Sequence, residues 1–334
     1  MAKKTYNRIG NIDFSAGSEV TLDLKPSNPI VGYHLDVETS LDIDATLTLR
    51  DESPLTAITR IDLEMDSEIL QRWSAAQLYM YNYFLTGTNG PLDGHGTSVT
   101  DPDLGRFHLF LPCKLMNSGF PGLSYLDPTR SNSFQLRVSW DTAAGAGMVS
   151  AGTMDYNSST HMTVTQVELT PPQGTSSQEF LLSMGLPNKV LIARQIQRTF
   201  DSAVSDATIA LQKNHDIVGF LLRVSTGTTS YVLSDAALNE LALVENGTHT
   251  VMQGTYNEWQ NMNDWEQRLS EDYIPGAPTV SGSRVEGGIY VNLIEQGISD
   301  ILKPQGLSSL ELVMDVDADT RIDLTVLELA PAGR

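Results

Sequence analysis

An internal repeat constrains this chain more than any other feature of its sequence. Residues 20–37, VTLDLKPSNPIVGYHLDV, align without a gap with residues 207–224, ATIALQKNHDIVGFLLRV, at an offset of 187. Apolar residues match apolar residues at alternating positions, as expected for half-buried strands. The repeat therefore predicts that one unit of strand, turn and strand occurs twice.

The match continues in the same order along the chain. Four further pairs of segments resemble each other: 66–67 and 246–247, 105–107 and 288–290, 134–140 and 310–316, and 162–171 and 322–331. The offset falls from 187 to 160, so the first copy has the longer loops, of which 141–161 is the most evident. Several matches in one order predict a tandem duplication of almost the whole chain.

A helical stretch is predicted after the early strands of each copy, because apolar residues recur there at steps of three or four. Asp66 or Ser67 could cap the first stretch, and Gly87 could end it. The residues that mark the stretches are Ile69, Trp73, Ala76, Met80 and Tyr83 in the first copy and Tyr256, Trp259, Met262 and Leu269 in the second.

Short alternating segments separated by turn residues predict an all-β protein of the sandwich or barrel class. The predicted domains are residues 1–170 and 191–334. The linker at 171–190 begins with Pro171-Pro172 and continues as a polar stretch.

The charge and the cysteine content exclude several classes of function. The net charge is −20, from 41 acidic and 21 basic residues, and such a surface repels phosphates, so no sequence-specific nucleic acid is expected as a partner. The single cysteine, Cys113, can form neither an internal disulfide nor a cysteine-based zinc site. No run reaches the roughly 18 apolar residues of a membrane span, and the first ten residues lack a signal peptide's apolar stretch. A soluble chain is expected.

Two successive β-barrels, each with a helix after its early strands, resemble the double jelly-roll major capsid proteins of tailless icosahedral DNA viruses, which often enclose a membrane. The resemblance covers nearly the whole chain and implies two tandem eight-stranded jelly-roll β-barrels with short helical insertions. It further implies a homotrimer of pseudo-hexagonal outline that assembles into the icosahedral shell of a virus such as a bacteriophage. The protein would be made in the host cytoplasm and reside in the virion capsid.

The same resemblance suggests partners: other copies of the chain, first in the trimer and then in the capsid lattice, with minor capsid and vertex proteins. An internal viral membrane would be a further partner. Lys3, Lys4 and Arg8 form a basic cluster near the N-terminus, and we expect an arm there that faces this membrane or a neighbouring capsomer.

Aromatic residues of the helical stretches are the candidates for the subunit interface, because a surface helix buries only one stripe against its own barrel. The candidates are Trp73, Tyr79 and Tyr81 in the first stretch and Trp259 and Trp265 in the second. Tyr79, Tyr81, Tyr83 and Phe84 could alternatively form a platform that stacks on sugars.

No cofactor is expected apart from a structural calcium ion. Asp315, Asp317 and Asp319 alternate near the end of a predicted strand, where their carboxylates could share one face, although a solvated strand face is the preferred explanation. The sequence has no catalytic motif, and its six histidines lack metal-ligand spacing, so an enzyme such as a cupin is not expected. The alternative function is a two-domain β-sandwich module that binds carbohydrate or mediates adhesion.

Overall fold

The computed structural model of the chain describes residues 3–24, 28–43, 47–50, 52–93, 98–99, 105–116, 126–127, 131–145, 148–183, 189–227, 232–275, 284–294 and 301–331. The chain forms two compact units. The first comprises Met1–Asn82, Gly90–Arg194 and Ala330–Arg334, and the second comprises Tyr83–Asn89 and Gln195–Leu329.

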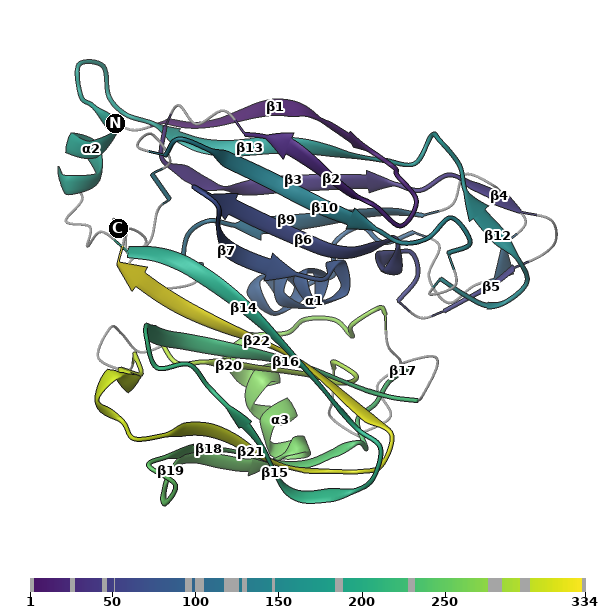
Figure 1. Cartoon of the computed structure of the whole chain (residues 1–334), viewed down its shortest axis with the longest axis vertical. Helices are drawn as coiled ribbons and strands as arrows, with labels where there is room; N and C mark the ends of the chain where they lie inside the picture. Colours follow the sequence, from purple (N-terminus) through teal and green to yellow (C-terminus); the bar gives the residue numbers. More distant parts are fainter. Residues whose placement is uncertain are drawn as a thin grey trace. The chain divides into compact units, whose positions relative to one another are not determined.

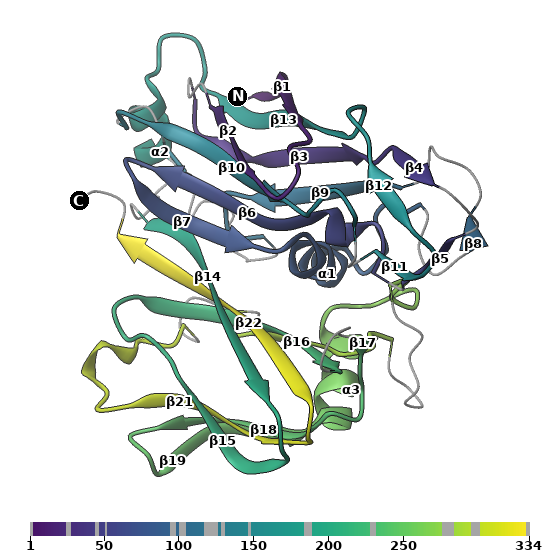
Figure 2. The ribbon, with the colours of Figure 1, turned by 45° about the vertical axis from the view of Figure 1, so that its right-hand side comes forward.

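Eight strands of the first unit form two antiparallel sheets (Figure 1). One sheet has the order β1-β13-β3-β9, and the other has the order β2-β10-β6-β7. In both views of the ribbon, β10 lies between β2 and β6 (Figure 2). The bounds are β1 Lys3–Asp13, β2 Glu19–Asp23, β3 Ile30–Glu38, β6 Ile58–Met65, β7 Glu68–Trp73, β9 Arg106–Pro112, β10 Phe134–Trp140 and β13 His161–Thr170.

The second repeat has the same arrangement and lies in the second unit, except for Lys189–Arg194 of β14 and Ala330–Pro331 of β22. One sheet has the order β14-β22-β16-β20, with the short β17 (Val232–Leu233) also paired with β16, and the other has the order β15-β21-β18-β19. The bounds are β14 Lys189–Phe200, β15 Val204–Ala210, β16 Asp216–Thr226, β18 Leu238–Glu245, β19 His249–Thr255, β20 Gly288–Asn292, β21 Leu310–Val316 and β22 Thr320–Pro331.

Both units have the strand order of a jelly roll. When these eight strands are numbered in chain order, one sheet reads 1-8-3-6 and the other reads 2-7-4-5 in each unit. Residues 20–37 cover most of the second and third strands, β2 and β3, and residues 207–224 cover the end of β15 and most of β16. The prediction that the two matching segments occupy equivalent strands is confirmed, as is the all-β fold class.

Alternation between buried and partly exposed residues fixes the register of these strands. In β10 and in β21, every second residue is buried, so each strand turns one apolar face to the core of its own unit. The buried residues are Phe134, Leu136, Val138 and Trp140 in β10 and Leu310, Leu312, Met314 and Val316 in β21.

The helix α1 (Ala75–Thr86) begins later than the sequence suggests, whereas α3 (Tyr256–Glu266) begins at Tyr256, where the second helical stretch was predicted. A strand precedes each of them, so Ile69 and Trp73 lie on β7 and not on a helix. The predicted cap at Asp66 or Ser67 is wrong, because these residues form the β6–β7 turn with φ angles of 51° and 69°. Gly87 does end α1: its N–H donates to the Tyr83 carbonyl at 2.8 Å.

Each helix starts at the same kind of cap. The Ser74 hydroxyl accepts from the Gln77 N–H at 3.2 Å, and Thr255 forms a reciprocal capping box with Glu258. The eighth residue of each helix is an asparagine, Asn82 in α1 and Asn263 in α3.

These two asparagines hold the sixth strand of their repeat by its backbone. The Asn82 amide donates to the Phe110 carbonyl at 2.8 Å and accepts from the Phe110 N–H at 2.7 Å. Asn263 makes the same pair of bonds with the backbone of Tyr290. We call this contact the asparagine clamp. It makes Phe110 and Tyr290 equivalent.

The predicted match of 105–107 with 288–290 is therefore wrong by three residues. The register of the third and sixth strands agrees with the clamp, because Gly32 lies opposite Pro112 and Gly219 lies opposite Asn292. Both glycines are needed where they stand. A Cβ atom added to Gly32 would lie 2.6 Å from the carbonyl oxygen of Leu111, and one added to Gly219 would lie 2.7 Å from the carbonyl oxygen of Val291.

The first unit carries additional short strands at one end (Figure 2). Residues 141–161 are more than the loop that was predicted, because β11 and β12 lie within them and pair with β5 and β4. The bounds are β4 Leu41–Ile43, β5 Leu47–Leu49, β8 Ser98–Val99, β11 Val149–Ala151 and β12 Met154–Tyr156. These elements enclose a small core of Leu41, Leu49, Ala57, Met148, Met154 and Tyr156.

Three shorter helices complete the described elements: η1 at Leu55–Ala57, α2 at Ser177–Ser183 and η4 at Pro304–Gly306. The helix α2 lies within the predicted linker 171–190, and β14 begins just before the predicted second domain. Within the described ranges, no helix is long and apolar enough to span a membrane.

Candidate assembly surfaces

Three of the predicted interface aromatics are buried within the chain itself. Trp73 and Tyr81 stack with ring centroids 5.1 Å apart, and the Trp73 Nε1–H donates to Gln71 Oε1 at 3.1 Å. The Tyr79 hydroxyl donates to the Gly90 carbonyl at 2.7 Å. All three aromatic side chains are at most 1% exposed. They cannot contact a neighbouring copy, because other residues of the same chain cover them.

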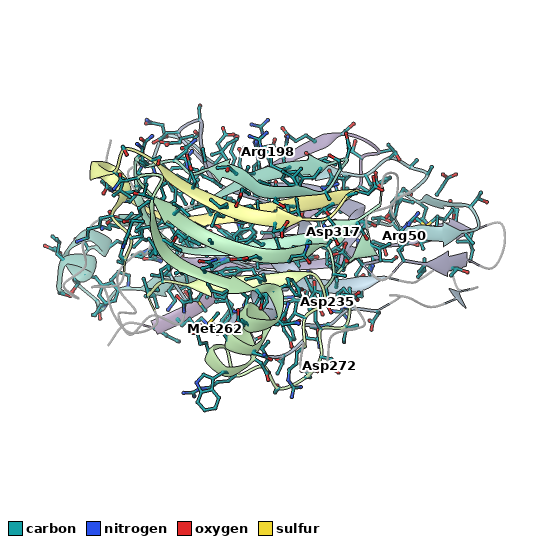
Figure 3. The ribbon with its side chains drawn as sticks, turned by 90° about the horizontal axis from the view of Figure 1, so that it is seen from below. Arg50, Arg198, Asp235, Met262, Asp272 and Asp317 are labelled. Atoms are coloured by element: carbon teal, nitrogen blue, oxygen red, sulfur yellow. The ribbon has the colours of Figure 1, made fainter. Side chains whose placement is uncertain are left out.

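The helix α3 has one buried and one exposed tryptophan. Trp259 is buried and its Nε1–H donates to the Leu241 carbonyl at 3.3 Å, so this interface candidate is also corrected. Trp265 is 86% exposed. The half-buried Met262, labelled in Figure 3, lies one turn earlier on the helix. Trp265 is therefore the one of the five candidates that a neighbouring subunit could cover.

The N-terminal basic cluster lies on a strand and not on a loose arm. From Lys3 to Asp13 the chain pairs with β13, as the outer strand of its sheet. The Lys4 Nζ lies 5.2 Å from the ring centroid of Tyr6, and Arg8 donates to Asn11 at 2.9 Å. Lys3, Lys4 and Arg8 are exposed, so they present positive charge along this outer strand.

A histidine cluster that the sequence did not indicate lies on the same sheet. His34 Nδ1 and His108 Nε2 are 3.0 Å apart, and His108 Nδ1 lies 2.8 Å from Asp36 Oδ1. The His34 ring stacks on Tyr6 of β1 with centroids 6.0 Å apart. An ionised Asp36 accepts the Nδ1–H of His108, and His108 Nε2 then accepts the Nδ1–H of His34. This hydrogen-bonded chain holds when both rings are neutral.

Burial, together with the nearby His108 and Lys4, lowers the pKa of His34 below its usual value of 6.5, although Asp36 opposes this effect. Because the pKa of His34 is lower in the folded chain than in the unfolded chain, the unfolded chain binds more protons as the pH falls below about 6.5. The neutral His34 therefore stabilises the fold above about pH 6.5, and this contribution is lost as the pH falls through its lowered pKa.

We expect His34→Gln to reduce the loss of stability between pH 7.5 and pH 5, because glutamine does not bind a proton in either the folded or the unfolded chain. Urea unfolding of both proteins at the two pH values measures this difference. His161→Gln is the matched control. His161 lies on β13 of the same sheet, and its ring is hydrogen-bonded to the backbone carbonyl of Ser159. An acid response of His34→Gln equal to that of the unmodified chain would contradict the expectation.

The aspartates proposed for calcium do not form a metal site. Asp315 lies on β21, whereas Asp317 follows the strand and Asp319 lies in the β21–β22 turn with a φ of 55°. Among the residues that the structure describes, no group of three His, Cys, Asp or Glu side chains could hold a metal ion. The alternation seen in the sequence ends with the strand, so the three carboxylates do not share a face.

No family model and no curated protein matches the sequence. Solved structures do match over almost the full length. The STIV major capsid protein aligns with a TM-score of 0.74 at 15% identity, covering 98% of this chain and 97% of that one; STIV is the Sulfolobus turreted icosahedral virus.

Two further capsid structures give the same result. The major capsid protein of bacteriophage PM2 aligns with a TM-score of 0.62 at 10% identity, covering 99% of each chain. A chain of the PBCV-1 virus capsid aligns with a TM-score of 0.59 at 11% identity, covering 98% of this chain and 94% of that one. With its two jelly rolls of identical strand order, the chain therefore has the double jelly-roll fold of these viral capsid proteins.

Proposed function

We propose that the protein is a major capsid protein that assembles as pseudo-hexameric homotrimers into an icosahedral viral shell, with a structural and not an enzymatic role. The observation that carries the proposal is the presence of two jelly rolls of the same topology in one chain, aligned end to end with viral capsid proteins. Three copies of a two-barrel chain place six similar walls around one axis, and such a ring tiles a hexagonal lattice.

The proposal places the protein in the virion after synthesis in the host cytoplasm. Its partners are other copies of the chain, together with minor capsid and vertex proteins. The net charge of −20 keeps free trimers apart until salt or counterions screen the repulsion. If the shell encloses a membrane, Lys3, Lys4 and Arg8 are the residues that anionic headgroups would attract.

The aromatic residues considered as a sugar-stacking platform give the sugar-binding alternative no support. Tyr79, Tyr81, Tyr83 and Phe84 are buried, each at most 1% exposed, so they offer no open face on which a sugar ring could stack. The proposal is tested by light scattering of the purified chain, which should give about three times 36.5 kDa, followed by electron microscopy of assembled particles. A monomer that binds glycans would favour the alternative.

Among single side chains, we expect that of Trp265 to contribute most to the free energy of trimer association. Trp265→Glu should weaken association by about 2 kcal/mol or more, roughly thirtyfold, because an exposed tryptophan covered by a partner is a typical hot spot. The fold should persist, because surface substitutions usually change stability by less than about 0.5 kcal/mol.

Sedimentation at graded concentrations measures this change. Val232→Glu serves as the control, since Val232 is another exposed apolar residue of the second unit, 48% exposed. If Trp265→Glu assembles as well as the control does, the trimer contact does not include Trp265.

A further inference from the structure

The outer edge of β7 is occupied within the chain. At one point Gln71 of β7 pairs in parallel with Ala193 of β14, and both residues belong to the first unit. In chain order, β7 is the fifth strand of the first repeat and β14 is the first strand of the second repeat. The chain thus pairs the fifth strand of one repeat with the first strand of another.

The equivalent of β7 in the second repeat is β19. Both strands follow a turn of positive φ angles, and their hairpins share a bulge, between Leu63 and Glu64 in one and between Leu243 and Val244 in the other. Before the bulge, Leu63 pairs with Gln71 and Leu243 pairs with Met252. Met252 therefore occupies the position of Gln71.

The equivalent of β14 in the first repeat is β1. Each is the first strand of its jelly roll and lies beside the last strand. Each also has a lysine and, five residues later, an arginine: Lys3 and Arg8 in β1, Lys189 and Arg194 in β14. This spacing places Asn7 at the position of Ala193.

Both equivalents end their sheets in the described part of the chain. The strand β19 is the last in the order β15-β21-β18-β19, and β1 is the first in the order β1-β13-β3-β9. Most residues of both strands are exposed, and Val251 of β19 is 39% exposed. An open edge strand presents a row of backbone donors and acceptors that another strand can pair with.

We propose that β1 of one copy pairs in parallel with β19 of a second copy, with Asn7 opposite Met252 of that copy. This proposal rests on the proposed function and names the contact that would join its subunits. Each copy supplies one β1 and one β19, so the contact is head-to-tail and can close into a ring. The ring would then repeat between copies the strand pairing that each chain makes internally.

The charge of β1 is opposite to that of the residues beside β19. Lys3, Lys4 and Arg8 make β1 basic. The strand β19 has no acidic residue itself, but the neighbouring β18 carries Glu240 opposite Thr255 and Glu245 opposite His249. In a chain of net charge −20, contact between β1 and β19 brings the basic residues near these glutamates, and salt should weaken it.

Cysteine cross-linking in the full-length chain tests the proposed register. Arg8→Cys and Gln253→Cys mark the neighbours one residue beyond Asn7 and Met252, and both positions are exposed. Adjacent strands place paired Cα atoms within the range that a disulfide spans. Under mild oxidation, the double variant should form covalent dimers and trimers. Cys113 is buried and should contribute little background.

The matched control combines Arg8→Cys with Thr208→Cys, because Thr208 is exposed on β15, the opposite edge strand of the same sheet. We expect the first pair to cross-link at least about tenfold faster, since bound neighbours react at millimolar effective concentrations. Equal rates for the two pairs, in a protein that is trimeric by light scattering, would overturn the pairing and leave the proposed function standing. A protein that remains monomeric would overturn both.

Hydrogen exchange on the unmodified chain provides a second test that needs no substitution. In the trimer, backbone amides of β19 should exchange more slowly than those of β15, although both strands end the same sheet. Vesicles of anionic lipid supply the competing occupant of β1. If such vesicles protect the β1 amides and trimer formation does not, β1 contacts a membrane and the strand pairing is wrong.

Discussion

Replacing Asp323 with alanine is expected to lower the free energy of unfolding of the second unit by about 3–5 kcal/mol, as is usual when one member of a buried ion pair is removed. Asp323 is 3% exposed and accepts from Arg223 at 2.9 Å, from Arg321 at 3.0 Å and from Gln197 at 2.9 Å. Its loss takes a carboxylate away from the buried guanidinium of Arg223. Urea unfolding measures the change.

Asp317→Ala is the control for this substitution. Asp317 is exposed in the turn that leads from β21 into β22, the strand of Asp323, and its side chain accepts from Asn239 at 3.3 Å. Removing this carboxylate should lower the free energy of unfolding by less than about 0.5 kcal/mol. Combining Asp323→Leu with Arg223→Met removes both charges and should recover much of the lost stability. If Asp323→Ala is as mild as Asp317→Ala, the buried carboxylate does not hold these strands together.

The strand glycines Gly32 and Gly219 should tolerate alanine poorly. In each case the new Cβ would lie less than 3 Å from a backbone carbonyl oxygen of the sixth strand, and a backbone cannot give way as a side chain can. We expect a loss of about 1–3 kcal/mol for each substitution. Gly32→Ala should be the more damaging, because its Cβ would also lie 2.5 Å from the Phe110 ring.

Gly306→Ala is the matched control, since a Cβ added there would have nothing within 4 Å and the change should be neutral or slightly stabilising. Thermal unfolding of the three variants checks the order Gly32, Gly219, Gly306. A wild-type melting temperature for Gly32→Ala would mean that β9 can move away from β3 at no cost.

The repeat made much of this fold predictable from sequence. The repeat, together with the alternation of apolar residues, located six of the eight strands in each copy. It missed β1 and β7 in the first copy and β14 and β19 in the second. In the first copy, Ile69 and Trp73 are spaced four residues apart and continue into the stripe of α1, so a strand and a helix read as a single helix.

The candidate surfaces were less predictable, because they depend on contacts between distant parts of the chain. His34 and His108 are 74 residues apart, and only the register of β3 with β9 brings their rings together. The sequence of α1 did not indicate which of its aromatic residues face a neighbouring subunit, since apolar residues occur on nearly all sides of the helix and the fold buries the aromatic ones. Trp265 differs because it follows two exposed asparagines, Asn257 and Asn261, on one polar face of α3.

The asparagine clamp has a consequence for how the two halves of the chain can evolve after a gene duplication. Asn82 and Asn263 recognise the main chain of the sixth strand, and every residue other than proline offers the same donor and acceptor. The side chains beside the clamp are therefore free to diverge. The first half carries His108 and Phe110 where the second carries Gly288 and Tyr290. Because the clamp binds only the main chain of the sixth strand, the first repeat can carry the histidine cluster on that strand while the second repeat carries none there and keeps the same fold.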